Sequence, residues 1–280
     1  MANKKNSLDF PLKGKYIAML APSFVVDFSY PEILSILKKL GFDKIVELTF
    51  GAKMINREYY RILKDSKELK ISSVCPVVVD FIQKNFPDYK KNLVLVDSPM
   101  ISTAKICKKF YPKHKTVFIS PCSFKKDEAR QSNYVDFVLD YNELRNLIYP
   151  FKIKDSKSKI QFDKFYNDYT KIYPITGALS KTAHLKKILK KKEIKVLEGV
   201  VALRDFLKKP VKRFRFLDVT SCKGGCIGGP CIQNKSPLFM RKRKVINYLK
   251  RSLKEDIPDT KKGVISKAES ISFVKKEEIF

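Results

Sequence analysis

The segment 221–231, with the sequence SCKGGCIGGPC, constrains the fold of this chain more than any other. It holds three of the six cysteines and four of the ten glycines, and a short, largely apolar run at 214–219 leads into it. Glycine has no Cβ, so the backbone of such a loop can approach a bulky group closely. Thiols held among free backbone N–H groups suit a metal–sulfur centre, because N–H groups can point at sulfur. We therefore expect this loop to hold an iron–sulfur cluster that distant cysteines complete.

Composition limits the class of protein. A chain of 280 residues can bury a large core in one or two domains, and its 44% hydrophobic content is ordinary for a globular protein. The sequence contains no apolar run of the length, about eighteen residues, that a membrane-spanning helix requires. Residues 1–15 are lysine-rich and lack the apolar region of a secretory signal, which favours a cytoplasmic location. In that compartment cysteines serve as ligands or buried thiols rather than as disulfides.

The charge balance is strongly basic, with 58 Lys and Arg against 29 Asp and Glu and a net charge of +29. A nucleic-acid-binding protein could carry this charge. However, the basic clusters at 186–192, 208–215 and 241–244 have the pattern of solvated helix faces and linkers, and none of them forms an aromatic-interleaved platform. A general lysine bias, suited to acidic electron-transfer partners, is therefore favoured over nucleic-acid binding. The only histidines, His114 and His184, supply a histidine-rich zinc site or a Ser–His triad poorly.

Short apolar runs alternate with amphipathic helical patterns along the chain, which predicts an α/β fold with a parallel sheet. The expected strands are 16–20, 44–50, 69–74, 93–96, 116–119, 135–139, 195–200 and 214–219. The expected helices are 31–40, 53–63, 76–86, 99–110, 141–148, 179–189, 201–207 and 236–253. Gly51 is expected to end the second strand.

The same patterns predict two lobes of twisted, mostly parallel sheet flanked by helices, with the iron–sulfur site in the cleft between them. A flexible lead (1–14) precedes the first α/β lobe (15–150), and a polar, lysine-rich linker (151–171) follows it. The second α/β lobe (172–252) carries the cysteine–glycine loop, and a tail (253–280) ends the chain.

Three cysteines, Cys75, Cys122 and Cys222, each come directly after a short apolar run. In open parallel sheets ligands bind beyond the carboxyl ends of the strands, so these thiols are expected to meet at one edge. Cys226 adds a fourth thiol from the same loop as Cys222, and four thiolates match a [4Fe–4S] cluster. Zinc on four cysteines is the rival interpretation. Structural zinc sites use compact paired knuckles, whereas Cys75 and Cys122 lie far apart, which favours a cluster.

Simpler interpretations exist for each of these residues. Cys75 and Cys122 could be ordinary buried thiols, but this explains neither their shared position after strands nor the prolines beside them. Cys107 lies within a helical pattern and is expected in the core, and Cys231 is expected to be a bystander of its loop.

Neighbouring residues suggest how an anionic group could be stabilised. Pro76 can begin a helix without losing a hydrogen bond, and a helix N-terminus favours a thiolate and an anionic cluster. Lys125 and Lys126 follow Cys122 closely, so either amine could donate to an anionic ligand. By residue type alone, both are better interpreted as surface lysines, and Glu128 as a surface carboxylate.

Three segments in order resemble the catalytic, H-cluster-bearing domain of [FeFe]-hydrogenases, the C-terminal domain of the iron hydrogenase large subunit. SSVCP at 72–76 resembles the signature TSCCP, and SPCSFKKDE at 120–128 resembles MPCxxKKxE. CKGGCIGGP at 222–230 resembles CPGGCIGGG, and the resemblance extends over roughly 16–250. The forms of the first and third segments look closest to the divergent, sensory branch of the family.

The resemblance implies a [4Fe–4S] cluster on Cys75, Cys122, Cys222 and Cys226. It also implies a two-iron subsite carrying CO and cyanide, bridged through Cys226 and supplied by hydrogenase maturation proteins. Lys125 would hydrogen-bond a cyanide, and Glu128 would belong to the proton path.

Departures from the family pattern bear on activity. The proton-donating cysteine of the family is Val74 here, the serine of the proton path is Val94, and the methionine before Pro-Cys is Ser120. A valine cannot relay a proton, and proton transfer contributes strongly to rate. We therefore expect slow hydrogen oxidation or proton reduction, or a redox- or hydrogen-sensing role.

The source of electrons is a second point of departure. The chain lacks a Cys-x2-Cys-x2-Cys segment, so a separate ferredoxin-like protein is expected to deliver them. The alternative is an electron carrier or assembly factor with only the [4Fe–4S] cluster.

Overall fold

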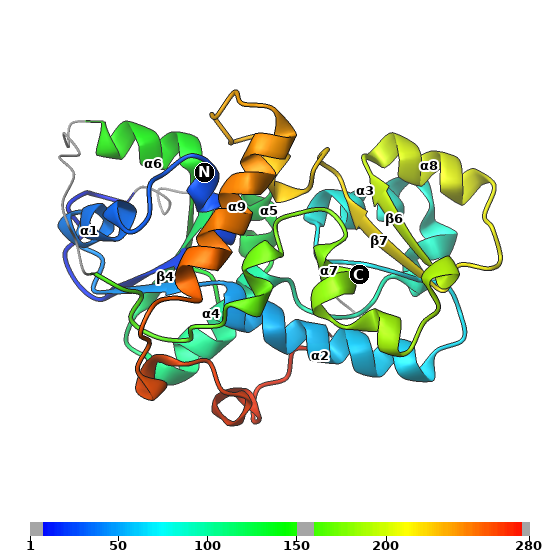
Figure 1. The fold of residues 1–280 in the computed structure, drawn as a ribbon, viewed down its shortest axis with the longest axis horizontal. Helices are drawn as coiled ribbons and strands as arrows, with labels where there is room; N and C mark the ends of the chain where they lie inside the picture. Colours follow the sequence, from blue (N-terminus) through cyan, green and yellow to red (C-terminus); the bar gives the residue numbers. More distant parts are fainter. Residues whose placement is uncertain (1–7, 150–159, 276–280) are drawn as a thin grey trace, which may run out of the picture.

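The computed structural model describes residues 8–149 and 160–275. Two parallel β-sheets lie along the long axis of the molecule, and helices cover both (Figure 1). The expected fold class, two lobes of parallel sheet flanked by helices, is confirmed. No helix in these two ranges combines the length and apolar character needed to cross a membrane.

The first sheet has the strand order β2-β1-β4-β5, and every neighbouring pair is parallel. Its strands are β1 (Tyr16–Leu20), β2 (Lys44–Glu47), β4 (Lys115–Ser120) and β5 (Phe137–Asp140). Leu20 pairs with Glu47 on one side and with Ile119 on the other, so the carboxyl ends of these strands lie level.

The second sheet has the order β3-β7-β6 and is also parallel. Its strands are β3 (Lys70–Ile71), β6 (Ile194–Glu198) and β7 (Phe216–Thr220). The central strand β7 is buried along nearly all of its length, as expected for a strand covered on both faces.

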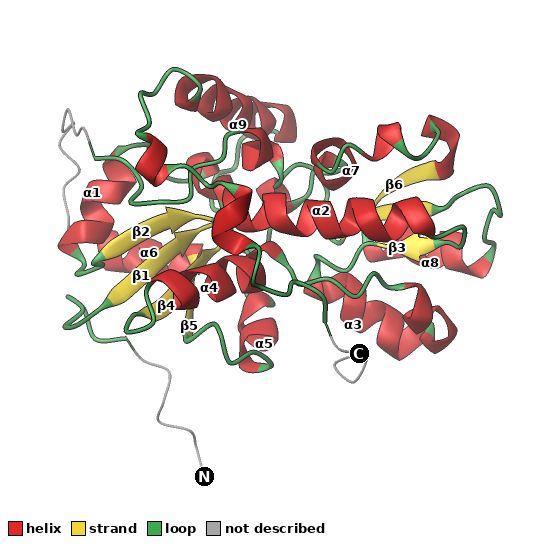
Figure 2. Ribbon diagram, turned by 90° about the horizontal axis from the view of Figure 1, so that it is seen from below, coloured by secondary structure: helices red, strands yellow, loops and turns green. Residues whose placement is uncertain are grey.

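Helices connect the strands and cover the faces of the sheets. They are α1 (Glu32–Lys39), α2 (Thr49–Asp65), α3 (Pro76–Asn85), α4 (Pro99–Phe110), α5 (Lys125–Arg130), α6 (Tyr141–Ile148), α7 (Ala178–Thr182), α8 (Val200–Lys208) and α9 (Leu238–Ser252). Helix α2 extends from the first sheet to the second (Figure 2), and its Tyr59 packs edge-on against Phe216 of β7. This helix therefore ties the two lobes into one body.

The expected lobe boundaries do not match the sheets. The expected first lobe contains Lys70 and Ile71, but these residues pair with Phe216 and Leu217 of β7. Strand β3 therefore lies in the second sheet, and α3, which follows it, packs against that sheet. Helix α9, expected in the second lobe, places Tyr248 in the core of the first, against Phe24. Parallel strands are joined by crossover connections, so strands that are far apart in the sequence can be neighbours in a sheet. For this reason the chain can pass from one lobe to the other and back.

Several local expectations also require correction. Strand β2 ends at Glu47, and Gly51 lies inside α2, where an added Cβ would stand 2.2 Å from the Thr103 Oγ1 of α4. Gly51 therefore permits close helix packing rather than ending a strand. The expected helix 179–189 breaks at His184, whose left-handed backbone (φ 53°) ends the run.

Residues 93–96, expected to form a strand, make only isolated β-bridges and no regular strand. Leu93 pairs with Ile71, and Val96 pairs with Val274 of the tail. The tail therefore packs back onto the first part of the chain, where Phe273 is buried.

The described part of the expected linker also lies in the core. Phe162 and Phe165 are each 1% exposed. Residues 1–7 of the expected lead, 151–159 of the linker and 276–280 of the tail lie outside the described ranges.

A buried ionic network joins three distant segments. Lys171, in the 3-10 helix Tyr169–Ile172, donates to Glu47 Oε2 at 2.5 Å and to the Tyr248 hydroxyl at 3.0 Å. The Tyr248 hydroxyl donates to Glu47 Oε1 at 2.9 Å. Burial raises the pKa of Glu47, and Lys171 opposes that rise. The network holds α9 and the segment before Tyr173 against the carboxyl end of β2.

We predict that Lys171→Ala lowers the free energy of unfolding by about 3–5 kcal/mol, because it leaves the buried Glu47 carboxylate without its cation. The exposed pair Lys84–Asp80, whose side chains are 70% and 60% exposed, provides the control. Lys84→Ala is expected to change that free energy by less than about 0.5 kcal/mol. Urea denaturation of both variants measures the difference, and equal losses would contradict a role for the buried network.

Candidate metal centre

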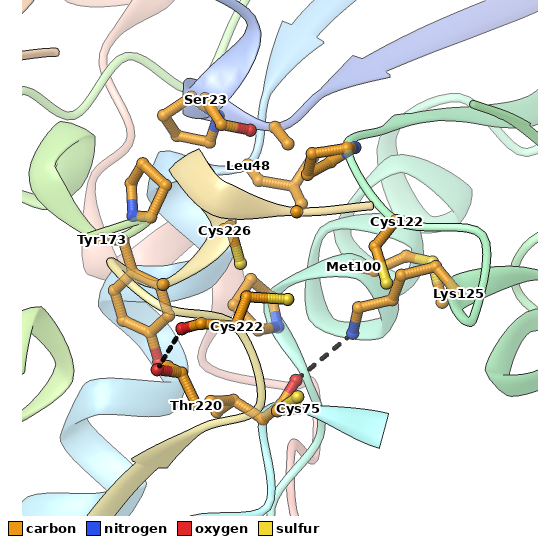
Figure 3. A pocket seen from close by; sticks show the side chains of 18 of the residues that line it. Ser23, Leu48, Cys75, Met100, Cys122, Lys125, Tyr173, Thr220, Cys222 and Cys226 are labelled. Atoms are coloured by element: carbon orange, nitrogen blue, oxygen red, sulfur yellow. Dashed lines mark hydrogen bonds between the residues drawn. The ribbon is translucent and has the colours of Figure 1, made fainter. Parts of the chain in front are cut away.

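Four cysteines from three segments of the chain line a single cavity of about 110 Å³ between the two sheets (Figure 3). Cys75 follows β3 and precedes α3, and Cys122 follows β4. Cys222 follows β7, and Cys226 begins the 3-10 helix Cys226–Gly228. The structure therefore brings together all four cysteines that the sequence selected.

The carboxyl ends of both sheets face this cavity. Ala21 follows β1 and Leu48 follows β2, and both line the cavity together with the cysteines that follow β3, β4 and β7. Convergence of strand ends is the general way in which parallel sheets build a site. Here two sheets contribute to one site from opposite sides.

Local structure positions Cys122 and Cys75 at the cavity. The Cys122 N–H donates to Ser120 Oγ at 3.1 Å, and Ser120 Oγ donates to the Cys122 carbonyl at 2.8 Å, which closes the turn after β4. Pro76 begins α3 directly after Cys75, as predicted, and Cys75 has an extended backbone at the helix start. The N-terminus of α3 thus lies beside the cavity.

The glycine loop closes onto the cavity by close backbone approach. Gly225 has φ 82°, and a Cβ there would stand 2.6 Å from the Pro174 carbonyl oxygen. A Cβ at Gly229 would stand 2.6 Å from the Pro121 carbonyl oxygen. These glycines are therefore required for the loop to reach two segments that also line the cavity.

Some of the backbone N–H groups that were expected to point at sulfur donate to carbonyls of the loop instead. The N–H groups of Gly225, Gly228 and Gly229 donate to backbone carbonyls at 3.0, 2.9 and 3.1 Å. At these three positions the loop stabilises itself rather than presenting donors to sulfur.

Burial and mutual proximity raise the pKa values of three of the four thiols, those of Cys122, Cys222 and Cys226. Desolvation in the cavity, together with the neighbouring thiols of Cys75, Cys122 and Cys222, raises the pKa of Cys226 to about 12. Burial also raises the pKa of Cys122 to about 11, partly opposed by Lys125. Thiols with raised pKa values do not all become thiolates at neutral pH without added positive charge, which metal ions supply. The donor set therefore fits a metal–sulfur group.

Ser221 is a site residue that sequence reasoning left without a role. Its Oγ lies 3.3 Å from Cys75 Sγ and 3.7 Å from Cys222 Sγ, between two of the four sulfurs. Only the pairing of β3 with β7 brings Cys75 close to Ser221.

Across 8–149 and 160–275, no three His, Cys, Asp or Glu side chains converge on a position for a single metal ion.

Lys125 is not the surface lysine that residue type alone suggests. Its side chain is 13% exposed, and its Nζ donates to the Val74 carbonyl at 3.3 Å and to the Glu128 carboxylate. Burial alone would lower the pKa of Lys125, but Glu128 and then the thiols of Cys75 and Cys122 raise it overall. Figure 3 shows the amine pointing toward the thiols. The site therefore keeps a cation beside the sulfurs.

Glu128 and Lys126 lie outside the cavity lining. Glu128 is connected to the cavity through its ion pair with Lys125 and also borders a separate surface groove with Asp97 and Lys105. Lys126 pairs with Asp140 at 3.0 Å and with a carboxylate of α6. Of the two lysines after Cys122, only Lys125 faces the site.

The two remaining cysteines do not line the cavity. Cys107 is fully buried and Cys231 is 3% exposed, and each belongs to a hydrophobic core cluster. Val74 lines the cavity next to Cys75.

Two further lining residues, Asp218 and Tyr173, were not predicted from the sequence. A single carboxylate in the apolar run 214–219 was a usable signal for Asp218, whereas no local pattern marks Tyr173.

We predict that the metal-free folded chain alkylates slowly at Cys122. A pKa of about 11 leaves the thiol protonated at pH 8, so its reaction with iodoacetamide is expected to be roughly tenfold slower than in the urea-unfolded chain. The rate in the folded chain is expected to keep rising toward pH 11, beyond the pH at which the unfolded chain levels off. Mass spectrometry of the Cys122 peptide measures both rates, and coincident pH profiles would contradict the raised pKa.

Comparison with curated proteins identifies related sequences. The chain is 27% identical to iron hydrogenase 1 of Clostridium pasteurianum over an alignment covering 82% of this chain and 52% of that protein. It is also 27% identical to the NADP-reducing hydrogenase subunit HndD of Solidesulfovibrio fructosivorans, covering 69% of this chain and 44% of that protein. The chain thus spans about half the length of the curated relatives it matches.

Comparison with solved structures shows the same fold. A structure of the [FeFe]-hydrogenase HydA1 from Chlamydomonas reinhardtii aligns with a TM-score of 0.63 at 14% identity, covering 93% of this chain and 88% of that one. A second [FeFe]-hydrogenase structure, described in terms of oxygen inactivation of the H cluster, aligns with a TM-score of 0.64 at 15% identity. It covers 94% of this chain and 91% of the other.

The sequence model of the iron-only hydrogenase large subunit, C-terminal domain, matches residues 14–230, a range that contains all four cavity cysteines. Because this match spans most of the 280 residues, the chain belongs to the family of the iron-only hydrogenase large subunit, C-terminal domain.

Proposed function

We propose that the chain is an iron–sulfur protein of the [FeFe]-hydrogenase type that binds a [4Fe–4S] cluster on Cys75, Cys122, Cys222 and Cys226. The observation that carries this proposal is the convergence of these four thiols on one cavity. Their sulfurs surround that space, which suits a group of several metal atoms better than a single zinc ion.

We extend the proposal to a two-iron CO/cyanide subsite bridged through Cys226. The lining beyond the thiols is mainly apolar and includes Pro76, Pro99 and Met100. Such a lining excludes water from a reactive group. Lys125 supplies the one ammonium among the lining residues, and a cyanide ligand would accept its hydrogen bond. Glu128 holds that ammonium in place rather than meeting the ligand itself.

When bound, such a group supplies two-electron chemistry between protons and hydrogen, and the chain must then move protons to and from the cavity. Val74 occupies the position of the family's proton-donating cysteine, and its side chain has no acidic hydrogen. Glu128 reaches the cavity only through Lys125, so any proton path that includes it passes the amine. We therefore propose slow turnover or a redox- or hydrogen-sensing role.

The presence of Val74 in the cavity lining also favours a second candidate. In that candidate the chain binds only the [4Fe–4S] cluster and acts as an electron carrier or assembly factor. The retained Lys125, with no ligand to meet in that case, favours the first candidate.

Partners follow from the same proposal. The net charge of +29 suits an acidic, ferredoxin-like protein as the source or acceptor of electrons. Hydrogenase maturation proteins would supply the two-iron subsite. A cytoplasmic location is part of this proposal, and nucleic-acid binding is not.

Infrared spectroscopy tests the proposal and separates the two candidates. After anaerobic production with the hydrogenase maturation proteins, we expect bands of bound CO and cyanide. Four irons and four sulfides per chain without such bands would support the second candidate. A colourless protein that contains zinc would contradict both.

We predict that Cys222→Ala removes the brown cluster absorbance and lowers the iron content, because a thiolate ligand is lost. Cys231→Ala is the matched control, since Cys231 lies in the same loop but outside the cavity lining. It is expected to retain both the absorbance and the iron. A retained spectrum in Cys222→Ala, or equal losses in the two variants, would refute the ligand assignment.

We predict that Val74→Cys raises hydrogen turnover of the fully matured protein by about tenfold or more, because a thiol restores a proton donor at the cavity. Val77→Cys places a thiol on the neighbouring α3, outside the cavity lining, and is expected to leave the rate unchanged. Hydrogen evolution from reduced methyl viologen measures both. Equal rates for Val74→Cys and the unmodified protein would argue against a missing proton relay.

A further inference from the structure

The hydroxyl of Tyr173 is buried at the metal centre without a hydrogen-bond partner among the described residues. Tyr173 directly follows the 3-10 helix Tyr169–Ile172, and its side chain lines the cysteine cavity. A buried polar group left unpaired costs about 1–3 kcal/mol, so its presence needs an explanation. The partner is therefore to be sought in the cavity.

Two polar groups close to Tyr173, those of Asp218 and Tyr59, accept hydrogen bonds from other residues. The electrostatic neighbours of Tyr173 are Tyr59, Asp218 and Cys226. Asp218 Oδ2 accepts hydrogen bonds from the Ser180 N–H at 2.9 Å and the Ser180 hydroxyl at 2.7 Å. The Tyr59 hydroxyl accepts from the Ser73 N–H at 2.9 Å. None of these bonds includes the Tyr173 hydroxyl.

Tyr173 and Lys125 lie on opposite sides of the thiols. Figure 3 shows the Tyr173 ring on the side of Cys222 and Cys226, and the Lys125 amine approaching from the other side. Burial raises the pKa of Tyr173 well above its ordinary value, so its hydroxyl stays protonated and can donate. A group bound between them would meet an ammonium on one side and a hydroxyl on the other.

We propose that the Tyr173 hydroxyl donates a hydrogen bond to an acceptor atom of the iron–sulfur group on the Cys226 side of the cavity. This inference rests on the proposed function. A hydrogen bond donated to such a group favours its more negative, reduced state, and so raises the reduction potential. Tyr173 is thus a positioning residue that tunes the potential from the side opposite Lys125.

The test is Tyr173→Phe, which keeps the ring and removes only the hydroxyl. The protein and the variant are reconstituted anaerobically with iron and sulfide and poised at the midpoint potential of the unmodified protein. Electron paramagnetic resonance then measures the reduced fraction. Loss of one hydrogen bond is expected to lower the ratio of reduced to oxidised cluster about fivefold.

Tyr166→Phe is the matched control. The Tyr166 hydroxyl is also buried and lacks a hydrogen-bond partner in the described ranges, but Tyr166 lies outside the cavity lining. Its removal is expected to leave the ratio of reduced to oxidised cluster unchanged, although it removes the same chemical group from the core.

The outcomes separate this inference from the proposed function. A Tyr173→Phe variant with the iron content and reduced fraction of the unmodified protein overturns the hydrogen bond while leaving the cluster assignment standing. An equal shift in Tyr166→Phe also overturns it, because the effect would then follow from core packing. An unmodified protein that binds no iron overturns the proposed function, and this inference with it.

Discussion

The carboxyl ends of two parallel sheets face each other across one cavity, and the site depends on this arrangement. Cys122 arrives from the first sheet, and Cys75 and Cys222 arrive from the second. No single segment of the chain supplies more than two of the thiols. The relative placement of the sheets, maintained by α2 and by the return of α9 to the first sheet, therefore determines whether the four cysteines form a site at all.

Four thiolates at this site would require a bound cation. The pKa values of Cys122 and Cys226 are raised by burial and by neighbouring thiols, so the free site resists ionisation. Lys125 partly opposes this, and Glu128 keeps that lysine charged. A metal–sulfur group would satisfy the thiolates, while the amine would remain available for an anionic ligand. Metal binding would therefore be coupled to the loss of the thiol protons.

Packing far from the thiols contributes to the same site. The network of Lys171, Glu47 and Tyr248 fixes the segment immediately before Tyr173 against the end of β2. Gly51 allows α2 and α4 to approach closely beneath the first sheet. Some of the residues that line the cavity are therefore held by contacts that lie outside the sequence motifs.

The sequence by itself selected the four cysteines that meet at the cavity and determined the parallel α/β class, and the family resemblance directed attention to Lys125, because motifs and strand–helix periodicity are local. It could not determine that β3 pairs with β7, that α9 returns to the first lobe, or that the tail meets Val96. These pairings depend on long-range contacts between surfaces that are equally apolar in sequence. Ser221 and Tyr173 became site residues only through them, because burial and proximity are properties of the folded chain.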